Sequence, residues 1–136
     1  MRRRRVSRDV LDSSAVLASF YGESGADTID DILRGAVIST VNVAEIISKL
    51  VERGMSADMA RSAVIDTGIE IVPFDLDQAV LVGDFRQKTR ALGLSLGDRA
   101  CLALAKQIGG RAVTADRAWK AVENLDLEVI LFRGEP

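Results

Sequence analysis

The sequence predicts an α/β fold in which a five-stranded parallel sheet lies between layers of helices. Three observations predict it. Short runs rich in Val and Ile alternate with longer segments of helical periodicity, no internal repeat occurs, and 136 residues with 48% apolar composition are enough for one core. We therefore expect a single three-layer domain.

The elements follow one another along the chain in this alternating pattern. The five expected strands are short and mostly rich in Val and Ile: Asp9–Asp12, Ala36–Ser39, Ile69–Phe74, Arg111–Thr114 and Glu128–Phe132. The expected helices have apolar residues at helical spacing: Ser24–Leu33, Val41–Arg53, Ala57–Thr67, Leu76–Leu92, Asp98–Ile108 and a short one near Ala115–Val122. Ser56 and Asp75 stand just before two of these helices and are expected N-caps.

The composition limits the chemistry that the chain can perform. The absence of histidine and the presence of one cysteine exclude Ser-His-Asp and Cys-His catalysis, His-ligated metals and Cys-rich zinc sites. The 20 Asp and Glu residues instead provide the oxygen ligands that suit Mg²⁺ and Mn²⁺. Cys101 lies in an apolar run, as a small buried hydrophobe in a reducing compartment would. No stretch approaches transmembrane length, so we expect a soluble, cytoplasmic protein.

Charge is distributed unevenly along the chain. The net charge is −2, but Arg2, Arg3, Arg4, Arg5 and Arg8 are five of the 18 basic residues, which leaves 13 basic against 20 acidic residues, or −7, for the remainder. We expect residues 1–5 to form a flexible basic leader and residues 6–133 a single domain. The leader is interpreted as a solvated tail because like charges repel, and an RNA-contacting arm is the alternative.

Two acidic residues follow expected strands. Asp12 comes directly after Val10-Leu11, and Asp116 comes shortly after the strand Arg111–Thr114. Ligands of open parallel sheets bind outside the carboxyl ends of the strands, so both acids are candidates for a functional site. Each also has an ordinary interpretation, because Asp12 fits a helix N-cap and Asp116 fits a first-turn acid favoured by the helix dipole.

Asp98 begins an apolar helix. The spacing Ser95-x-x-Asp98 resembles a capping box with Asp in place of Glu. Asp98 also shares a helical stripe with Cys101, Leu102 and Ala105, which would direct it along an apolar face. An inward carboxylate needs a partner or a metal ion.

Glu45 is the weakest candidate on physical grounds alone. Asn42-x-x-Glu45 fits a capping pair, Glu45 and Lys49 fit an i,i+4 ion pair, and Ser48 and Glu52 lie on the same stripe. Spacing alone therefore predicts a solvated acid.

Four segments occurring in this order resemble the PIN-domain ribonucleases: Val10–Ala18, Asn42–Ile46, Ser95–Ala105 and Val113–Trp119. More narrowly, the chain resembles a VapC-type toxin of a prokaryotic type II toxin–antitoxin pair, from about Val6 to Arg133. Each motif is loose by itself, and the specificity comes from finding all four at these separations. The arginine leader departs from the family pattern, so the resemblance assigns it no function.

The resemblance implies a PIN-like five-stranded parallel sheet and a carboxylate site at its edge. Asp12 and Asp98 would be the principal ligands of Mg²⁺ or Mn²⁺, with Asp116 a ligand directly or through water. Glu45 would be an outer ligand or a base that orients water, and Thr114 would orient a carboxylate or a metal-bound water. The implied activity is metal-dependent endoribonuclease cleavage by activated water in a toxin, with RNA as substrate.

The resemblance also implies a cognate antitoxin and a homodimer. Arg99 and Arg117 directly follow proposed ligands and are candidate phosphate contacts, with ordinary helix-surface charge as the alternative. Ser13 is a further candidate, and Trp119 is interpreted as a core or interface anchor. Two other functions remain open: a metal-dependent phosphohydrolase acting on a small phosphate ester, and a catalytically silent partner-binding domain.

Overall fold

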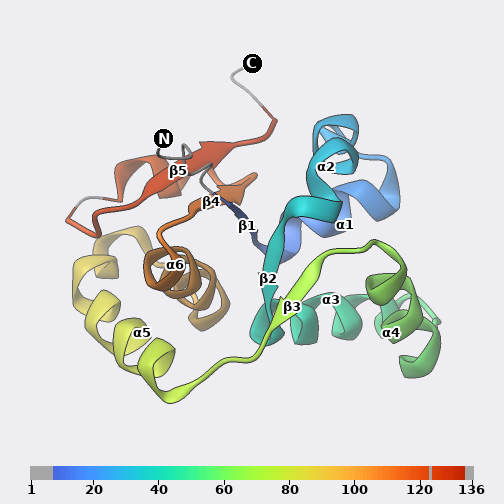
Figure 1. Cartoon of the computed structure of the whole chain (residues 1–136), viewed down its shortest axis with the longest axis horizontal. Helices are drawn as coiled ribbons and strands as arrows, with labels where there is room; N and C mark the ends of the chain where they lie inside the picture. Colours follow the sequence, from blue (N-terminus) through green and yellow to red (C-terminus); the bar gives the residue numbers. More distant parts are fainter. Residues whose placement is uncertain (1–7, 123, 134–136) are drawn as a thin grey trace, which may run out of the picture.

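The computed structural model describes residues 8–122 and 124–133 and contains one five-stranded sheet (Figure 1). Its strands are β1 (Asp9–Leu11), β2 (Val37–Ser39), β3 (Glu70–Val72), β4 (Arg111–Thr114) and β5 (Glu128–Leu131). They pair in parallel in the order β3-β2-β1-β4-β5. The predicted sheet is confirmed, with each strand inside its expected range. The predicted leader, residues 1–5, lies outside the described residues.

Within the described residues, six α-helices and three short 3₁₀ turns connect the strands. The helices are α1 (Ser13–Tyr21), α2 (Ala26–Ile32), α3 (Thr40–Glu52), α4 (Ala57–Asp66), α5 (Leu76–Lys88) and α6 (Leu96–Ile108). The 3₁₀ turns are η1 (Leu33–Gly35), η2 (Arg90–Leu92) and η3 (Arg117–Ala121). The expected helix 76–92 thus ends at Lys88 and continues as η2, and the short helix expected near 115–122 is 3₁₀. Ser56 and Asp75 are N-caps, as predicted, and accept from the backbone N–H of Met59 and Gln78.

Helix α1 was not among the expected helices. Its four successive residues Ala15, Val16, Leu17 and Ala18 are all buried. Burial on more than one side hides the 3.6-residue period by which an amphipathic helix is found in a sequence. The helix is nevertheless compatible with the N-cap interpretation of Asp12, whose backbone is extended and whose side chain accepts from Ala15 N–H.

The two faces of the sheet pack against different helices. Val10 and Ala112, which are paired across β1 and β4, contribute to a core with α5 and α6. The next pair, Leu11 and Val113, contributes to a second core with helices α1–α4. This alternation follows from the two-residue period of a strand, and Figure 1 shows the two groups of helices on opposite sides. Trp119 is fully buried in the α5–α6 core, which confirms its prediction as an anchor.

The order of the strands places a switch point in the middle of the sheet. The chain runs from β1 outward through β2 to β3, and later returns to β4 and β5 on the other side of β1. The carboxyl ends of β1 and β4 therefore lie side by side where the direction of winding changes, which is the usual ligand position in such sheets. In the described part of the chain, no helix is both long and apolar enough to cross a lipid bilayer.

Candidate active site

Asp12 occupies the switch point and links the end of β1 to the end of β4. One oxygen, Oδ1, accepts from the Ser14 hydroxyl at 2.6 Å and from Ala15 N–H at 3.1 Å. The other, Oδ2, accepts from the Thr114 hydroxyl at 2.6 Å, at the end of β4. The side chain is only 5% exposed. Asp12 is therefore an N-cap and a buried carboxylate at the sheet edge at the same time, so the two interpretations are compatible.

The environment of Asp12 disfavours its charge. Burial raises the pKa of Asp12 from 3.8 to about 6, and the negative charge of Asp98 acts in the same direction. The hydrogen bonds from Ser14, Thr114 and Ala15 lower this pKa but only partly offset the burial. At neutral pH the site thus holds a charged, buried carboxylate at a cost to stability.

The raised pKa of Asp12 predicts how stability depends on pH without metal. Between pH 4 and 6 the folded protein keeps the Asp12 proton that the unfolded chain releases, so this group lowers stability as pH rises through that window. The shift from 3.8 to about 6 corresponds to roughly 3 kcal/mol. Urea unfolding in EDTA, followed by the fluorescence of the single Trp119, should show this contribution in the wild type. The contribution of Asp12 to the pH dependence of stability should be missing in Asp12→Asn. A pH profile equal to that of the wild type would contradict the raised pKa of Asp12.

Asp98 lies in the first turn of α6 and forms the predicted capping box. Its Oδ2 accepts from Ser95 N–H at 2.9 Å, and its own N–H donates to Ser95 Oγ at 3.1 Å. The side chain is half-buried, whereas Cys101 and Ala105 on its predicted stripe are fully buried. Asp98 therefore stands at the rim of the apolar face.

Three of the four predicted acids lie near enough to one buried thiol to affect its pKa. Burial raises the pKa of Cys101 well above its usual range, and the charges of Asp12, Asp98 and Glu45 raise it further. The Cys101 Sγ lies 3.7 Å from the carbonyl oxygen of Val10 in β1. Because such charge effects weaken with distance, the fold brings these three carboxylates to one region.

Glu45 is not a simple solvated acid. Its Oε1 accepts from Asn42 Nδ2 at 2.8 Å, and the same amide donates to the Gly97 carbonyl at 3.1 Å. A Cβ at Gly97 would lie only 2.6 Å from Glu45 Cδ, so the carboxylate rests against the first turn of α6. Asn42 does not cap α3, because Ser39 is the N-cap. In the described residues, the predicted ion pair of Glu45 with Lys49 is not formed.

Asp116 is more exposed than the other three acids. It is the N-cap of η3, with Oδ1 accepting from Ala118 N–H at 3.0 Å, and not a first-turn acid as expected. Its backbone N–H donates to the Thr114 hydroxyl at 3.1 Å. Thr114 thus donates to Asp12 and accepts from Asp116, which ties the two predicted acids together through one buried hydroxyl.

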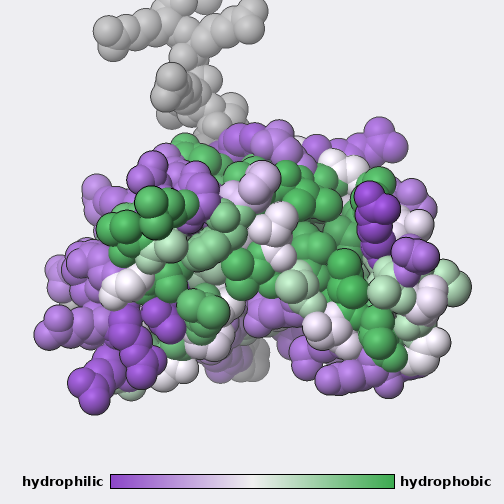
Figure 2. Space-filling view, turned by 90° about the horizontal axis from the view of Figure 1, so that it is seen from below, coloured by the Kyte–Doolittle hydropathy of each residue, from purple (hydrophilic) through white to green (hydrophobic). Residues whose placement is uncertain are grey.

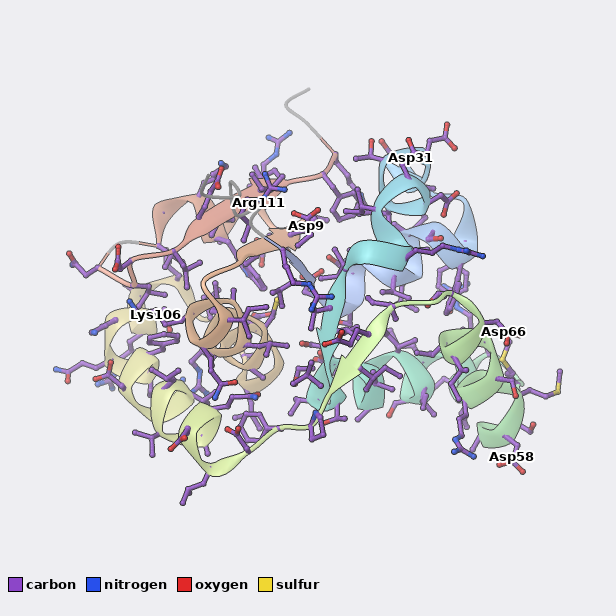
Figure 3. All side chains as sticks on the ribbon, viewed as in Figure 1. Asp9, Asp31, Asp58, Asp66, Lys106 and Arg111 are labelled. Carbon is purple, nitrogen blue, oxygen red and sulfur yellow. The ribbon has the colours of Figure 1, made fainter. Side chains whose placement is uncertain are left out.

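The two ends of the sheet differ in charge compensation. At the amino end, Asp9 pairs with Arg111 at 2.7 Å (Figure 3) and Arg8 pairs with Glu70 at 3.4 Å. At the carboxyl end, none of the four predicted acids takes part in an ion pair within residues 8–122 and 124–133. Within the same ranges, no group of three or more His, Cys, Asp or Glu residues is close enough to hold a metal ion. The carboxyl end of the sheet thus carries uncompensated negative charge, but its carboxylates are not already arranged as the ligands of a metal ion.

The candidate substrate contacts Arg99, Arg117 and Ser13 lie in different environments. Arg99 is half-buried and donates to the Val82 carbonyl at 3.0 Å, so it joins α6 to α5 and is not an ordinary surface charge. Arg117 is exposed beside Asp116. In the described chain, Ser14 and not its neighbour Ser13 provides the hydroxyl from α1 that contacts Asp12.

Sequence reasoning missed three residues that shape this region: Ser14, Asn42 and Gly97. Ser14 stands in the first turn after an N-cap, where a hydroxyl can reach the capping carboxylate. Gly97 lies inside the start of a helix, where glycine is unfavourable without a packing reason. Asn42 appears in the sequence only as a possible capping residue, and nothing local indicates its contact with Gly97, 55 residues away.

Comparison with known proteins identifies the family. The family model described as PIN domain matches residues 10–125, which is most of the chain and includes all four acids. The chain belongs to the PIN domain family. No curated protein matches it significantly by sequence.

Solved structures share this PIN fold at low sequence identity. DNA-bound VapBC from Salmonella typhimurium is 15% identical, with a TM-score of 0.69 and coverage of 91% of this chain and 97% of that one. FitAcB from Neisseria gonorrhoeae is 20% identical, with a TM-score of 0.67 and coverage of 90% and 96%. VapC20 from Mycobacterium tuberculosis, described as a sarcin–ricin loop cleaving toxin, is 15% identical, with a TM-score of 0.69 and coverage of 88% and 98%. The PIN fold predicted from the sequence is thus confirmed.

Proposed function

We propose that this PIN domain is a Mg²⁺- or Mn²⁺-dependent endoribonuclease and the toxin of a toxin–antitoxin pair. The observation that carries the proposal is the uncompensated carboxylate edge at the switch point, with Asp12 buried there at a cost to stability. Membership of the PIN family and the fold shared with VapC20, a sarcin–ricin loop cleaving toxin, support RNA as the substrate class. Because RNA would be the target, we place the protein in the cytoplasm.

The chemistry of the acidic residues fits a hard divalent cation. They offer only oxygen ligands, carry no ion pair in the described residues, and include a buried group whose charge burial disfavours. Asp12 and Asp98 would be the principal ligands, with Asp116 a ligand directly or through water and Glu45 an outer ligand. Because the Asp98 carboxylate contacts Ser95 N–H, binding would require Asp98 to share or leave that contact. When bound, the cation would neutralise the acids, polarise the phosphate and lower the pKa of a water molecule.

The protein's own side chains would hold and orient the reacting groups. Thr114 and Ser14 fix both oxygens of Asp12, which sets the direction of its remaining lone pairs. Glu45 lines an open hollow of about 540 Å³ between α3 and the start of α6, together with Ser48, Lys49 and Ser95. The hollow gives Glu45 access to solvent, so it can orient a water molecule. Arg117, exposed beside Asp116, is the proposed phosphate contact.

A partner protein is expected to cover part of the surface. Large apolar side chains are exposed on α4 (Met59 and Ile65) and on α5 (Leu76 and Val80). Figure 2 shows apolar side chains among polar ones on the face that includes these helices. An antitoxin is a proposed partner, since several structures with this fold are toxin–antitoxin complexes. A second copy of the chain is the other proposed partner, and the exposed apolar side chains are what support it. Co-expression with an antitoxin from an adjacent gene should relieve growth arrest caused by the protein.

Replacing Asp98 with asparagine tests the proposed activity. The wild type should cleave structured RNA in the presence of Mg²⁺ or Mn²⁺, and addition of EDTA should abolish this cleavage. Asp98→Asn should lose this cleavage, by about 10²-fold or more, while keeping its fold, because the neutral amide still fits the capping box but ligates a cation poorly. Wild-type activity in Asp98→Asn would refute the assignment.

The same preparations separate the two other functions. Hydrolysis of p-nitrophenyl phosphate without RNA cleavage would indicate a phosphohydrolase acting on small esters. Absence of both activities, together with no change in thermal stability on Mn²⁺ titration, would indicate a catalytically silent binding domain.

A further inference from the structure

Asn42 is a buried amide at a contact between α3 and α6. The residue is 1% exposed and lies in the first turn of α3, three residues before Glu45. Its Nδ2 group donates to Glu45 Oε1 at 2.8 Å and to the Gly97 carbonyl at 3.1 Å. One amide thus joins the Glu45 carboxylate to the turn of α6 that carries Asp98.

The orientation of this amide is determined by its surroundings. Both nearby groups are oxygen acceptors, so a flipped amide would place Oδ1 against them and lose both hydrogen bonds. In the observed orientation, Oδ1 is buried and has no partner within residues 8–122 and 124–133. An unpaired buried oxygen lowers stability, and asparagine is a weaker helix former than leucine. The stability of α3 therefore does not explain asparagine at this position.

The packing around Glu45 leaves the carboxylate few alternatives. Gly97 contributes no side chain, and the Glu45 carboxylate occupies the space where a Cβ would stand. Asn42 holds Oε1 from the α3 side, and no hydrogen bond to Oε2 is found in the described residues. Asn42 thereby fixes Oε1, and Glu45 lines the hollow between α3 and α6.

We propose that Asn42 is a positioning residue, whose amide fixes the Glu45 carboxylate against α6 and so sets the position of Glu45 relative to Asp98. The catalytic consequence rests on the proposed nuclease function, whereas the effect on the Glu45 side chain does not. Asn42 acts through Glu45 and is not itself assigned a contact with substrate.

The test replaces Asn42 with leucine, which keeps the branching of the side chain at Cγ and removes the amide. The expected result is an unchanged or higher Tm, a fall in kcat of about 100-fold with little change in KM for RNA, and Mn²⁺ binding about tenfold weaker by calorimetry. In a Glu45→Gln background, the same replacement should cause no further loss, because Asn42 would have no carboxylate to position. A merely structural role would instead lower Tm and give losses that add.

Gln78 in α5 provides a matched control. It is also fully buried, donates to the Pro73 carbonyl and to Gln107 Oε1, and has an unpartnered Oε1 in the described chain. Gln78→Leu should therefore change stability in a similar way and leave cleavage and Mn²⁺ binding at wild-type levels. An equal loss of activity in both variants would overturn the proposal.

A metal-free crystal structure of Asn42→Leu separates this proposal from the proposed function. Displacement of the Glu45 carboxylate is expected, and an unmoved carboxylate would overturn the positioning role whatever the activity. A wild type that cleaves no RNA, combined with a displaced Glu45 in the variant, would refute the nuclease and retain the positioning role. If Asn42→Leu does not fold, Asn42→Asp applies the same test, because it replaces both N–H donors with an oxygen in the same shape.

Discussion

Asp12→Asn is expected to abolish metal-dependent RNA cleavage and to stabilise the metal-free protein. Removing the charged ligand at the switch point should reduce cleavage by about 10³-fold. The same change removes a buried charge whose pKa burial raises to about 6. At pH 7.5 in EDTA the variant should gain up to roughly 3 kcal/mol, and the gain should shrink as pH falls below 6 and vanish well below pH 3.8, where Asp12 is protonated in both states.

The measurement combines RNA cleavage with urea unfolding followed by Trp119 fluorescence. Asp31→Asn is the control, because Asp31 is an exposed acid on α2, far from the sheet edge (Figure 3), and both its activity and its stability should match the wild type. An Asp12→Asn variant that is less stable than the wild type at pH 7.5, or that still cleaves RNA, would contradict the interpretation of Asp12 as a buried, charged metal ligand. An ordinary N-cap would not produce a gain of stability with a loss of activity, since asparagine caps a helix about as well as aspartate and would leave both nearly unchanged.

Gly97→Ala should inactivate the protein without unfolding it. A Cβ at this position would lie 2.6 Å from Glu45 Cδ, so the carboxylate has to move. Rotation of the Glu45 side chain would cost its hydrogen bond to Asn42, whereas alanine favours the helix by up to about 1 kcal/mol and offsets part of that cost. We expect cleavage to fall by about 100-fold, to the level of Glu45→Gln, with the free energy of unfolding within about 1 kcal/mol of the wild type.

Gly83→Ala is the matched control for this substitution. Gly83 also lies inside a helix, α5, but a Cβ there meets nothing within 4 Å. The control should keep wild-type cleavage and gain about 0.5–1 kcal/mol of stability. Wild-type cleavage in Gly97→Ala would show that the close approach of Glu45 to α6 has no catalytic importance.

The sheet could be predicted from the sequence because its signals are local. The strands are short runs, mostly rich in Val and Ile, and Val10 and Leu11 are directed to opposite faces by the two-residue period alone. Helix α1 could not be found in this way, since four of its consecutive residues are buried. Its helical period was hidden by tertiary burial.

The residues of the candidate site also differ in how far local sequence signals could identify them. Asp12 and Asp116 were identified because each follows a strand of a parallel sheet, and Asp98 because it begins an apolar helix. Glu45 depended on the family resemblance, since its spacing predicts a solvated acid. The sequence by itself thus determined the fold class and the acidic residues worth testing.

Only the tertiary structure decided how these acids are held. The Thr114 hydroxyl reaches Asp12 across 102 positions of the sequence, and Asn42 reaches Gly97 across 55. Such contacts depend on how β4 lies beside β1 and how closely α3 approaches α6, which no local period specifies. The physical reason is that periodicity reports which side of an element is buried, whereas a hydrogen bond between distant segments depends on their packing to within a fraction of an ångström.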